Sequence, residues 1–171
     1  MNDFSYFTGN MDHIIEESDD HRDLGVQISA DGSFNVHIYN VIKKVRQKIG
    51  WMGRSFYSRD INFMRKLFTT VIRPNLDYCS QIWAPREGPL MDALEKVQKD
   101  FTRLIPELRH LSYSDRLKKL RITSLQRRYD RYRILYTRKI LMGLVPDVCI
   151  GIRKDASARN GLKFEIPSRK N

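Results

Sequence analysis

The sequence RDINFMRKLFTTVIRPNLDY, residues 59–78, predicts the helix around which the rest of the chain is organised. Its apolar residues recur at helical spacing and share one stripe: Ile61, Met64, Leu67, Phe68, Val71 and Ile72. Arg65, Lys66 and Arg73 fall on the other faces. We expect Ser58 to cap this helix. We also expect Pro74 to stop or kink it, because proline lacks a backbone donor.

Helical periodicity continues on both sides of this stretch. We expect Ser33 to cap a preceding helix whose stripe is Phe34, Ile38, Val41, Ile42, Val45 and Ile49. The clearest stripe follows later, and we call it the leucine seam: Leu90, Leu94, Val97, Phe101 and Leu104. Ser112 and Ser124 are expected to cap two further helices, with Gly143 just after the last one. The prediction is a mainly α fold, a helical bundle over residues 33–145.

We also predict whether several residues outside the main stripes are buried or exposed. The group Trp51, Met52, Phe56 and Tyr57 is more typical of a core than of a base-stacking surface. After Ser124, one side of the helix carries Leu125, Tyr129, Tyr132, Tyr136 and Ile140. Arg116 is expected to face outward, beside inward-facing Leu117 and Leu120.

The first 32 residues predict short strands, at residues 4–7, 13–15 and 24–29, with a charged turn at residues 16–23. Two or three such strands are not stable alone, so this small N-terminal β portion must complete a sheet or lie against the helices. The neighbouring Asp19 and Asp20 are a pair of the kind that can hold two metal ions. No strong apolar strand precedes them, so we interpret them as a solvated turn and predict no catalytic or metal-binding residue.

The net charge of +11 is unevenly distributed. Residues 1–35 hold one cation and eight acids, which sum to −7, whereas the remaining residues hold 30 cations and 12 acids, which sum to +18. A domain this basic favours nucleic acid as a partner, with an anionic membrane surface second. A basic surface that only aids solubility is the alternative.

The cysteines and the hydropathy of the chain indicate the cellular compartment. The chain has two cysteines, Cys79 and Cys149, without a zinc-ligand spacing, which indicates a reducing compartment and a buried thiol at Cys79 rather than a nucleophile. No apolar run approaches the roughly 20 residues of a membrane span. We therefore expect an intracellular protein of the nucleus or cytoplasm, neither secreted nor transmembrane.

Four pieces of the sequence, in this order, carry a resemblance to a known family: DLGVQIS, SFNVHIYNVIKKVRQKIGWMGRSF, LFTTVIRPNLDYCSQIWAP and LEKVQKDFTRLIPELRHLSYSDRLKKLRITSLQRRYDRYRI. Together they resemble the region after the catalytic palm in the reverse transcriptases of LINE-type, jockey-like non-LTR retrotransposons. The resemblance covers about two-thirds of the chain, from residue 23 to about residue 140.

The resemblance implies a division of the chain into a palm remnant and a thumb. Residues 1–32 would be the β remnant of the palm sheet, with a primer-grip-like strand at Leu24, Gly25 and Val26. Residues 33–145 would be a thumb-like helical domain that holds an RNA–DNA hybrid or a primed RNA or DNA. The implied phosphate contacts are Lys43, Lys44, Arg46 and Arg54, with Arg73, Lys96, Lys99 and Arg103 as weaker candidates. Such contacts position a duplex without selecting its sequence.

In that family the catalytic aspartates and their Mg²⁺ belong to palm motifs upstream of this region. The resemblance therefore implies a truncated or fragmentary polymerase, with no cofactor, no small-molecule substrate and no nucleotide incorporation from this chain alone. Residues 146–171 are expected to be a basic, poorly ordered tail. The alternative functions are an adaptor that binds protein through the leucine seam and an amphipathic membrane-surface binder. A sequence-selective helix-turn-helix protein is a lesser variant of the binding interpretation.

Overall fold

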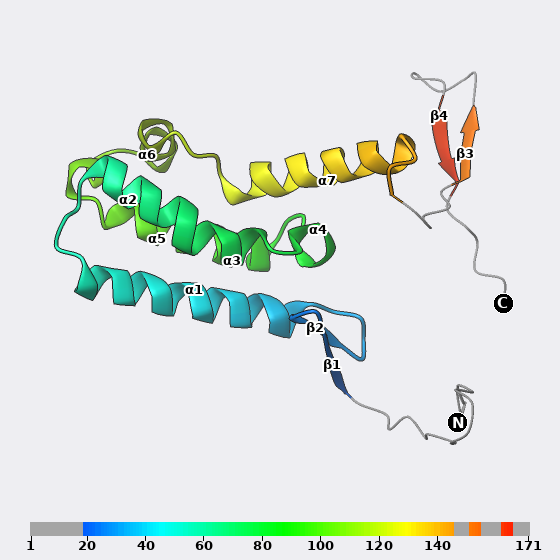
Figure 1. The fold of residues 1–171 in the computed structure, drawn as a ribbon, viewed down its shortest axis with the longest axis horizontal. Helices are drawn as coiled ribbons and strands as arrows, with labels where there is room; N and C mark the ends of the chain where they lie inside the picture. Colours follow the sequence, from blue (N-terminus) through cyan, green and yellow to red (C-terminus); the bar gives the residue numbers. More distant parts are fainter. Residues whose placement is uncertain (1–18, 146–150, 155–161, 166–171) are drawn as a thin grey trace.

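The computed structural model describes residues 19–145, 151–154 and 162–165 (Figure 1). It is mainly helical with a small antiparallel β-hairpin on its N-terminal side, which confirms the predicted fold class. The helices are α1 (Asn35–Ser55), α2 (Ile61–Leu67), the π-helix η1 (Phe68–Ile72), α3 (Arg73–Asp77), α4 (Ser80–Trp83), α5 (Pro89–Arg103), the 3₁₀ turn η2 (Pro106–Leu108), α6 (Tyr113–Leu120) and α7 (Leu125–Leu141). The strands are β1 (Asp20–Asp23), β2 (Val26–Ser29), β3 (Gly151–Lys154) and β4 (Leu162–Glu165).

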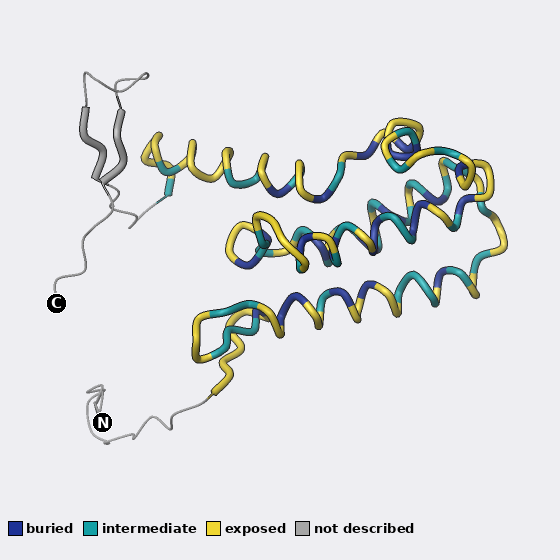
Figure 2. The backbone as a smooth tube through the Cα atoms, turned by 180° about the vertical axis from the view of Figure 1, so that it is seen from behind, coloured by how far each residue is buried: buried dark blue, intermediate teal, exposed yellow. Residues whose placement is uncertain are grey.

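The helices lie in three layers (Figure 1). Helix α1 forms one outer layer, α2 to α3 and α5 form the middle, and α6 and α7 form the other outer layer. Helix α5 contacts both α1 and α7, and the Phe68 ring of the middle layer lies 5.0 Å from that of Phe101 on α5. Figure 2 shows that α1 and α7 are exposed on the sides that face away from the middle layer. Those outer sides are where the molecule can meet a partner.

We call α2, η1 and α3 the central rod, because they form one uninterrupted helical run. The run does not stop at Pro74, which lies in the first turn of α3. The wider π-helical turn comes directly before the proline, and there the Arg73 N–H donates to the Phe68 carbonyl five residues earlier. The Thr70 hydroxyl and the Asn75 amide each donate to the backbone carbonyl four residues earlier, at 2.8 and 2.7 Å. These side chains satisfy carbonyls in the irregular turn.

Two of the predicted N-caps are wrong and two are confirmed. Asp60, not Ser58, caps the central rod, since its carboxylate accepts from the backbone N–H of both Asn62 and Phe63. Phe34, not Ser33, precedes α1 and provides no side-chain cap. Ser112 and Ser124 cap α6 and α7 as predicted. At the end of α7, Gly143 has a φ of 67° and closes the helix in a Schellman arrangement, also as predicted.

The strand and the turn of the N-terminal hairpin are formed by other residues than predicted. Residues 20–23, expected in a turn, form strand β1, and the turn is Leu24–Gly25, with φ values of 45° and 87°. Positive φ at both central residues is the geometry of a type I′ hairpin turn. It is costly at leucine, and the Tyr78 hydroxyl donates to the Leu24 carbonyl at 2.8 Å, which helps to hold it. Strand β2 is tied to α1, because the Gln27 N–H donates to His37 Nδ1.

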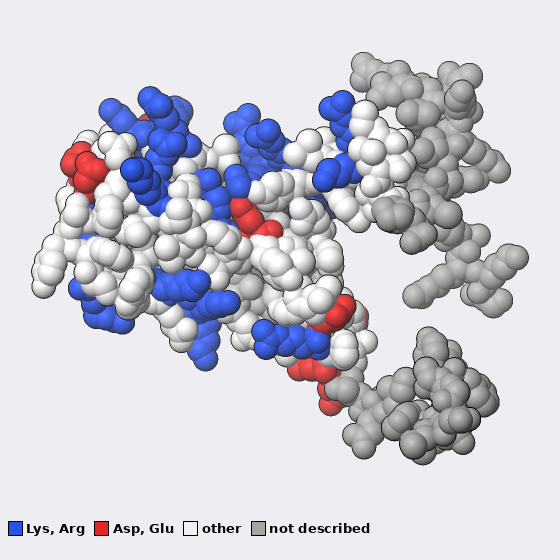
Figure 3. All heavy atoms as spheres, in the orientation of Figure 1, with Lys and Arg blue, Asp and Glu red and all other residues white. Residues whose placement is uncertain are grey.

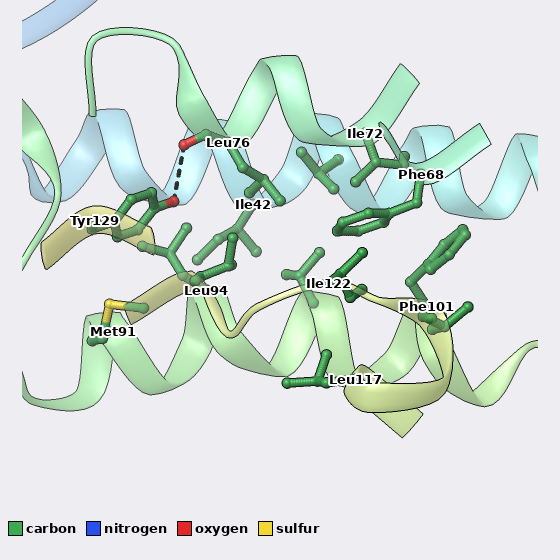
Figure 4. Packing of buried hydrophobic residues seen from close by; sticks show 14 of the residues in the cluster. Ile42, Phe68, Ile72, Leu76, Met91, Leu94, Phe101, Leu117, Ile122 and Tyr129 are labelled. Atoms are coloured by element: carbon green, nitrogen blue, oxygen red, sulfur yellow. Dashed lines mark hydrogen bonds between the residues drawn. The ribbon is translucent and has the colours of Figure 1, made fainter. Parts of the chain in front are cut away.

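The core is one cluster that joins every layer (Figure 4). Ile72, Leu76, Leu94, Val97 and Phe101 are fully buried in it. Tyr129 of α7 is buried as well, and its hydroxyl donates to the Leu76 carbonyl at 2.9 Å. The apolar stripe of residues 59–78 and the leucine seam therefore both face the core, as their spacing predicted.

Some assignments to inner or outer positions are wrong. In the group expected in the core, Met52 is buried, but Trp51 is 49% exposed and Tyr57 is 98% exposed. On α7 only the first half of the expected stripe is buried, and Tyr136 is exposed. Arg116, expected to face solvent, is buried, and its guanidinium lies 5.7 Å from the centre of the Tyr113 ring. An aromatic ring attracts a guanidinium placed over its face, so an arginine can occupy a buried position beside it.

The predictions for the two ends of the chain fall largely outside the described residues. The strands expected at residues 4–7 and 13–15 lie outside them. Within the tail expected to be poorly ordered, β3 and β4 pair antiparallel, with Gly151 opposite Glu165 and Lys154 opposite Leu162. The sequence analysis did not predict this hairpin.

Replacing Asp60 with alanine tests the observed cap. The carboxylate satisfies two N–H groups at the start of the central rod, so we expect Asp60→Ala to lower the free energy of unfolding by about 1 kcal/mol. Ser58→Ala, two residues earlier, is the matched control and should leave it unchanged. Urea unfolding followed by circular dichroism measures both. An equal loss in the two variants would contradict the assignment.

The ionisation of Tyr129 makes the free energy of unfolding depend on pH in the alkaline range. Burial raises the pKa of Tyr129 above its usual range, so the folded phenol keeps its proton where the unfolded one loses it, above about pH 10. The resulting stabilisation is complete below that pH and is lost as the pH rises. Tyr129→Phe should be less stable than the parent by about 1–2 kcal/mol at pH 7, because the Leu76 carbonyl loses its donor.

We expect the difference between Tyr129→Phe and the parent to shrink when urea unfolding is repeated above pH 10, since phenylalanine has no proton to lose. Tyr57→Phe is the control, because Tyr57 is almost fully exposed. Its stability should follow the parent at every pH. A difference that stays constant with pH for Tyr129→Phe would show that the phenol ionises freely in the folded protein.

Candidate nucleic-acid interface

Basic side chains gather along two edges of the molecule. Figure 3 shows Lys and Arg over α1 on one edge and over α6 and α7 on the opposite edge, with mostly uncharged surface between them. We call the first group, Lys43, Lys44, Arg46 and Arg54, the α1 face. All of its members are exposed. The two edges are separated by the middle layer of helices, so they are treated as distinct surfaces.

The α1 face follows the helical repeat on the side away from the core. Lys43 and Arg54 lie on the outer side, aligned through Gln47 and Gly50 at spacings of four, three and four residues, whereas Lys44 and Arg46 lie on its two flanks. Between Lys43 and Arg54 the helix rises by roughly 16 Å, or about five steps of a nucleic-acid strand. The core-facing side of the same helix carries Ile42 and Val45, both buried.

Within the described part of the chain, no member of the α1 face makes an ion pair or a hydrogen bond to a carboxylate. Lys48, by contrast, is half-buried and donates to the Asn75 side chain at 3.0 Å. Two exposed aromatic residues border the α1 face, Tyr39 at 61% and Trp51 at 49% exposure. The face therefore presents uncompensated cations beside flat rings, a combination that suits nucleic acid.

The four weaker candidates do not join the α1 face. Lys96 and Arg103 are exposed on α5, which packs against the core side of α1. Lys99 is half-buried, with its ammonium 5.3 Å from the centre of the Tyr113 ring. Arg73 is half-buried in the central rod, with its guanidinium 5.4 Å from the centre of the Phe68 ring.

Two of the three residues that resemble a primer grip lie at the hairpin turn, and the third lies in a strand. Leu24 is 81% exposed, Gly25 forms the turn with it, and Val26 starts β2 and is buried. A Cβ added at Gly25 would meet only Tyr78, at 4.0 Å, so the glycine is explained by its positive φ and not by a close backbone approach. Strand β2, which begins at this turn, contacts α1, the helix that carries the α1 face.

A second basic site, not predicted from the sequence, lies between α7 and the central rod. It is a hollow of about 860 Å³ lined by five arginines, and we call it the arginine hollow. Its arginines are Arg73, Arg121, Arg127, Arg128 and Arg131. The sequence marks α7 as very basic, and the spacing of Arg127 and Arg131 places both on one side of the helix. The approach of Arg73 from another helix has no local signal.

Asp77 compensates one charge of the arginine hollow. Arg128 Nε donates to both Asp77 carboxylate oxygens at 2.9 Å, and its second nitrogen lies 2.7 Å from one of them. The Tyr132 hydroxyl donates to the same carboxylate at 3.1 Å. The hydrogen bond to Asp77 raises the pKa of Arg128, whereas burial, followed by the nearby Arg128, lowers the pKa of Arg73.

The alternative sites are less accessible or less organised. In the leucine seam, Leu94, Val97 and Phe101 are fully buried, so the exposed seam expected of an adaptor is not observed. Asp19 and Asp20 are both exposed, and Asp20 accepts from the Gln27 side chain. Cys79 is half-buried. In residues 19–145, no three His, Cys, Asp or Glu side chains are grouped so that they could hold a metal ion.

Comparison of the chain with protein-family models, curated proteins and solved structures gives no match. Across the described helices, none combines the length and the apolar composition needed to cross a membrane.

Asp77→Asn tests the compensation at the arginine hollow. Arg128 and Arg73 would then lie half-buried without the carboxylate, so we expect the free energy of unfolding to fall by about 1–3 kcal/mol. Asp130→Asn is the matched control, because its pair with Arg133 is more exposed and should contribute less than about 1 kcal/mol. Thermal or urea unfolding at low salt measures both. Equal effects would contradict the special position of Asp77.

Proposed function

We propose that this chain is a thumb-like nucleic-acid-binding domain that holds a template–primer duplex, an RNA–DNA hybrid or a primed RNA or DNA, through its phosphates. The observation that supports the proposal best is the α1 face, four exposed cations on one helix without carboxylate partners in the described part of the chain. The resemblance to the thumb of LINE-type reverse transcriptases supplies the identity of the duplex.

Sequence-independent binding follows from the kind of contact. Lysine and arginine on the outside of a helix reach phosphates, which are the same at every base pair. A template–primer duplex must be held while its sequence changes, so such contacts suit the role. We therefore propose positioning of the duplex and not base selection.

The electrostatic origin of binding makes salt dependence its signature. Each phosphate neutralised on a B-form duplex contributes about 0.9 to the slope of log K against log salt concentration. Lys43 and Lys44 are adjacent in the sequence and both exposed on α1. Lys118 and Lys119 form an exposed pair on α6, in which Lys118 lies 3.1 Å from the Asp115 carboxylate. The chain thus contains two lysine pairs with equal charge on opposite edges.

The double variant Lys43→Gln/Lys44→Gln tests the α1 face. We expect weaker binding to an RNA–DNA hybrid and a slope reduced by up to about 1.8, because two phosphate contacts are lost. Lys118→Gln/Lys119→Gln, with the same change in net charge, should alter neither quantity. Fluorescence anisotropy over a series of salt concentrations measures both.

Two results would contradict the proposal. The first is an unchanged affinity and slope in Lys43→Gln/Lys44→Gln. The second is an equal loss in the control pair, which would show that only net charge matters. A set of hybrids with unrelated sequences completes the test, since the proposal requires the same affinity for all of them.

A further inference from the structure

The arginine hollow has more positive charge than its own acids neutralise. Of its five arginines, only Arg128 is paired with a carboxylate in the described part of the chain. Asp130 also lines the hollow, but its carboxylate is bound to Arg133. The hollow is therefore a concave, cationic site on the edge of the molecule opposite the α1 face.

Arg73 is the residue that most needs an anion. It is half-buried, and in the described part of the chain its guanidinium contacts the Phe68 ring but donates no hydrogen bond. Burial and the neighbouring Arg128 lower the pKa of Arg73, and Asp77 offsets them only in part, which means that the charge of Arg73 is held at a cost. A guanidinium has five N–H donors in a planar fork that matches phosphate oxygens. A phosphate in the hollow would supply both charge and acceptors.

The hollow also offers a flat surface and apolar side chains. The Arg128 guanidinium lies 5.0 Å from the centre of the Tyr132 ring, and Asp77 fixes both groups by hydrogen bonds. Ile134, which is 68% exposed, and Leu135 continue the lining along α7. Nucleobases stack on guanidinium planes and aromatic rings. An intact duplex presents mainly phosphates, whereas an unpaired strand brings a phosphate and an accessible base together.

We infer that the arginine hollow binds single-stranded nucleic acid. Phosphates of the strand lie against Arg73, Arg127 and Arg131, and an unpaired base lies against the Arg128–Tyr132 pair. A volume of about 860 Å³ is within the range of sites that enclose small organic molecules, so it holds a short segment of the strand. This site is separate from the α1 face and adds an unpaired strand to the duplex of the proposed function.

The double variant Arg127→Gln/Arg131→Gln tests the inference. Both side chains are exposed and make no ion pair in the described part of the chain, so the fold should be retained. We expect binding of an oligouridylate of about eight nucleotides to weaken. Its salt slope should fall by up to about 1.4, because two single-strand phosphate contacts are lost. Lys118→Gln/Lys119→Gln removes the same charge from exposed positions outside both the arginine hollow and the α1 face, and it should leave oligouridylate binding unchanged.

Competition and a duplex probe separate the remaining outcomes. Tripolyphosphate and polyglutamate should each displace oligouridylate less effectively than an unlabelled single strand does. The inference is overturned if Arg127→Gln/Arg131→Gln leaves oligouridylate binding unchanged or weakens duplex binding equally. It is also overturned if tripolyphosphate binds as well as the strand, which would indicate a bare phosphate site, or if polyglutamate does, which would indicate an acidic protein segment. Failure of the α1 face to bind duplex would leave this test intact.

Discussion

The passage of the central rod past Pro74 is the constraint on which the arrangement of α7 depends. A helix that ended at the proline would leave Leu76 and Asp77 in a loop, with no fixed direction. The π-helical turn lets the rod continue, so that the Leu76 carbonyl meets the Tyr129 hydroxyl and the Asp77 carboxylate meets Arg128. Because α7 is docked by these two contacts, Arg73 becomes part of the same hollow as the α7 arginines.

The two basic edges differ in the way their charge is supported. On α1 the cations are exposed and separated along a single helix, so water and salt screen them from one another. In the arginine hollow they come from two directions, and one of them is withdrawn from water against a ring. Repulsion is correspondingly greater, and a single carboxylate, Asp77, pairs with Arg128 and offsets the repulsion only in part for Arg73. The first surface suits the phosphates of a duplex, and the second suits a short segment of an unpaired strand.

The features that were predictable from the sequence are those with a local cause. Burial repeats every three or four residues along each helix, so the stripe of the central rod, the leucine seam and the caps at Ser112 and Ser124 were predicted correctly. The cap of the rod was misplaced because Ser58 and Asp60 are both competent, and only the backbone geometry selects between them. The four residues of the α1 face are exposed as expected, since none of them belongs to the core stripe of the helix.

The features that were missed depend on contacts between distant residues. The arginine hollow exists because Arg73 and Arg128 come from helices that are far apart in the sequence. Arg116 is the exception, since the Tyr113 ring beside it is on the same helix. The turn at Leu24 was hidden for a related reason. Leucine rarely adopts positive φ, and the hydroxyl that supports it comes from Tyr78, which directly follows the central rod and is distant from Leu24 in the sequence.

Helix α7 consists of two parts with unequal resistance to opening. At its start, the Glu95 carboxylate accepts from the Leu125 and Gln126 N–H groups, and further along Arg133 donates to the carbonyls of Ala84 and Pro85. Past Arg133 nearly every residue of the helix is exposed. Backbone amides in the first part can exchange their hydrogens only when the contacts of α7 with α5 and with the α4–α5 connection are also broken. Amides in the second part become exchangeable when the helix frays from its C-terminal end. One continuous helix thus belongs to two cooperative units.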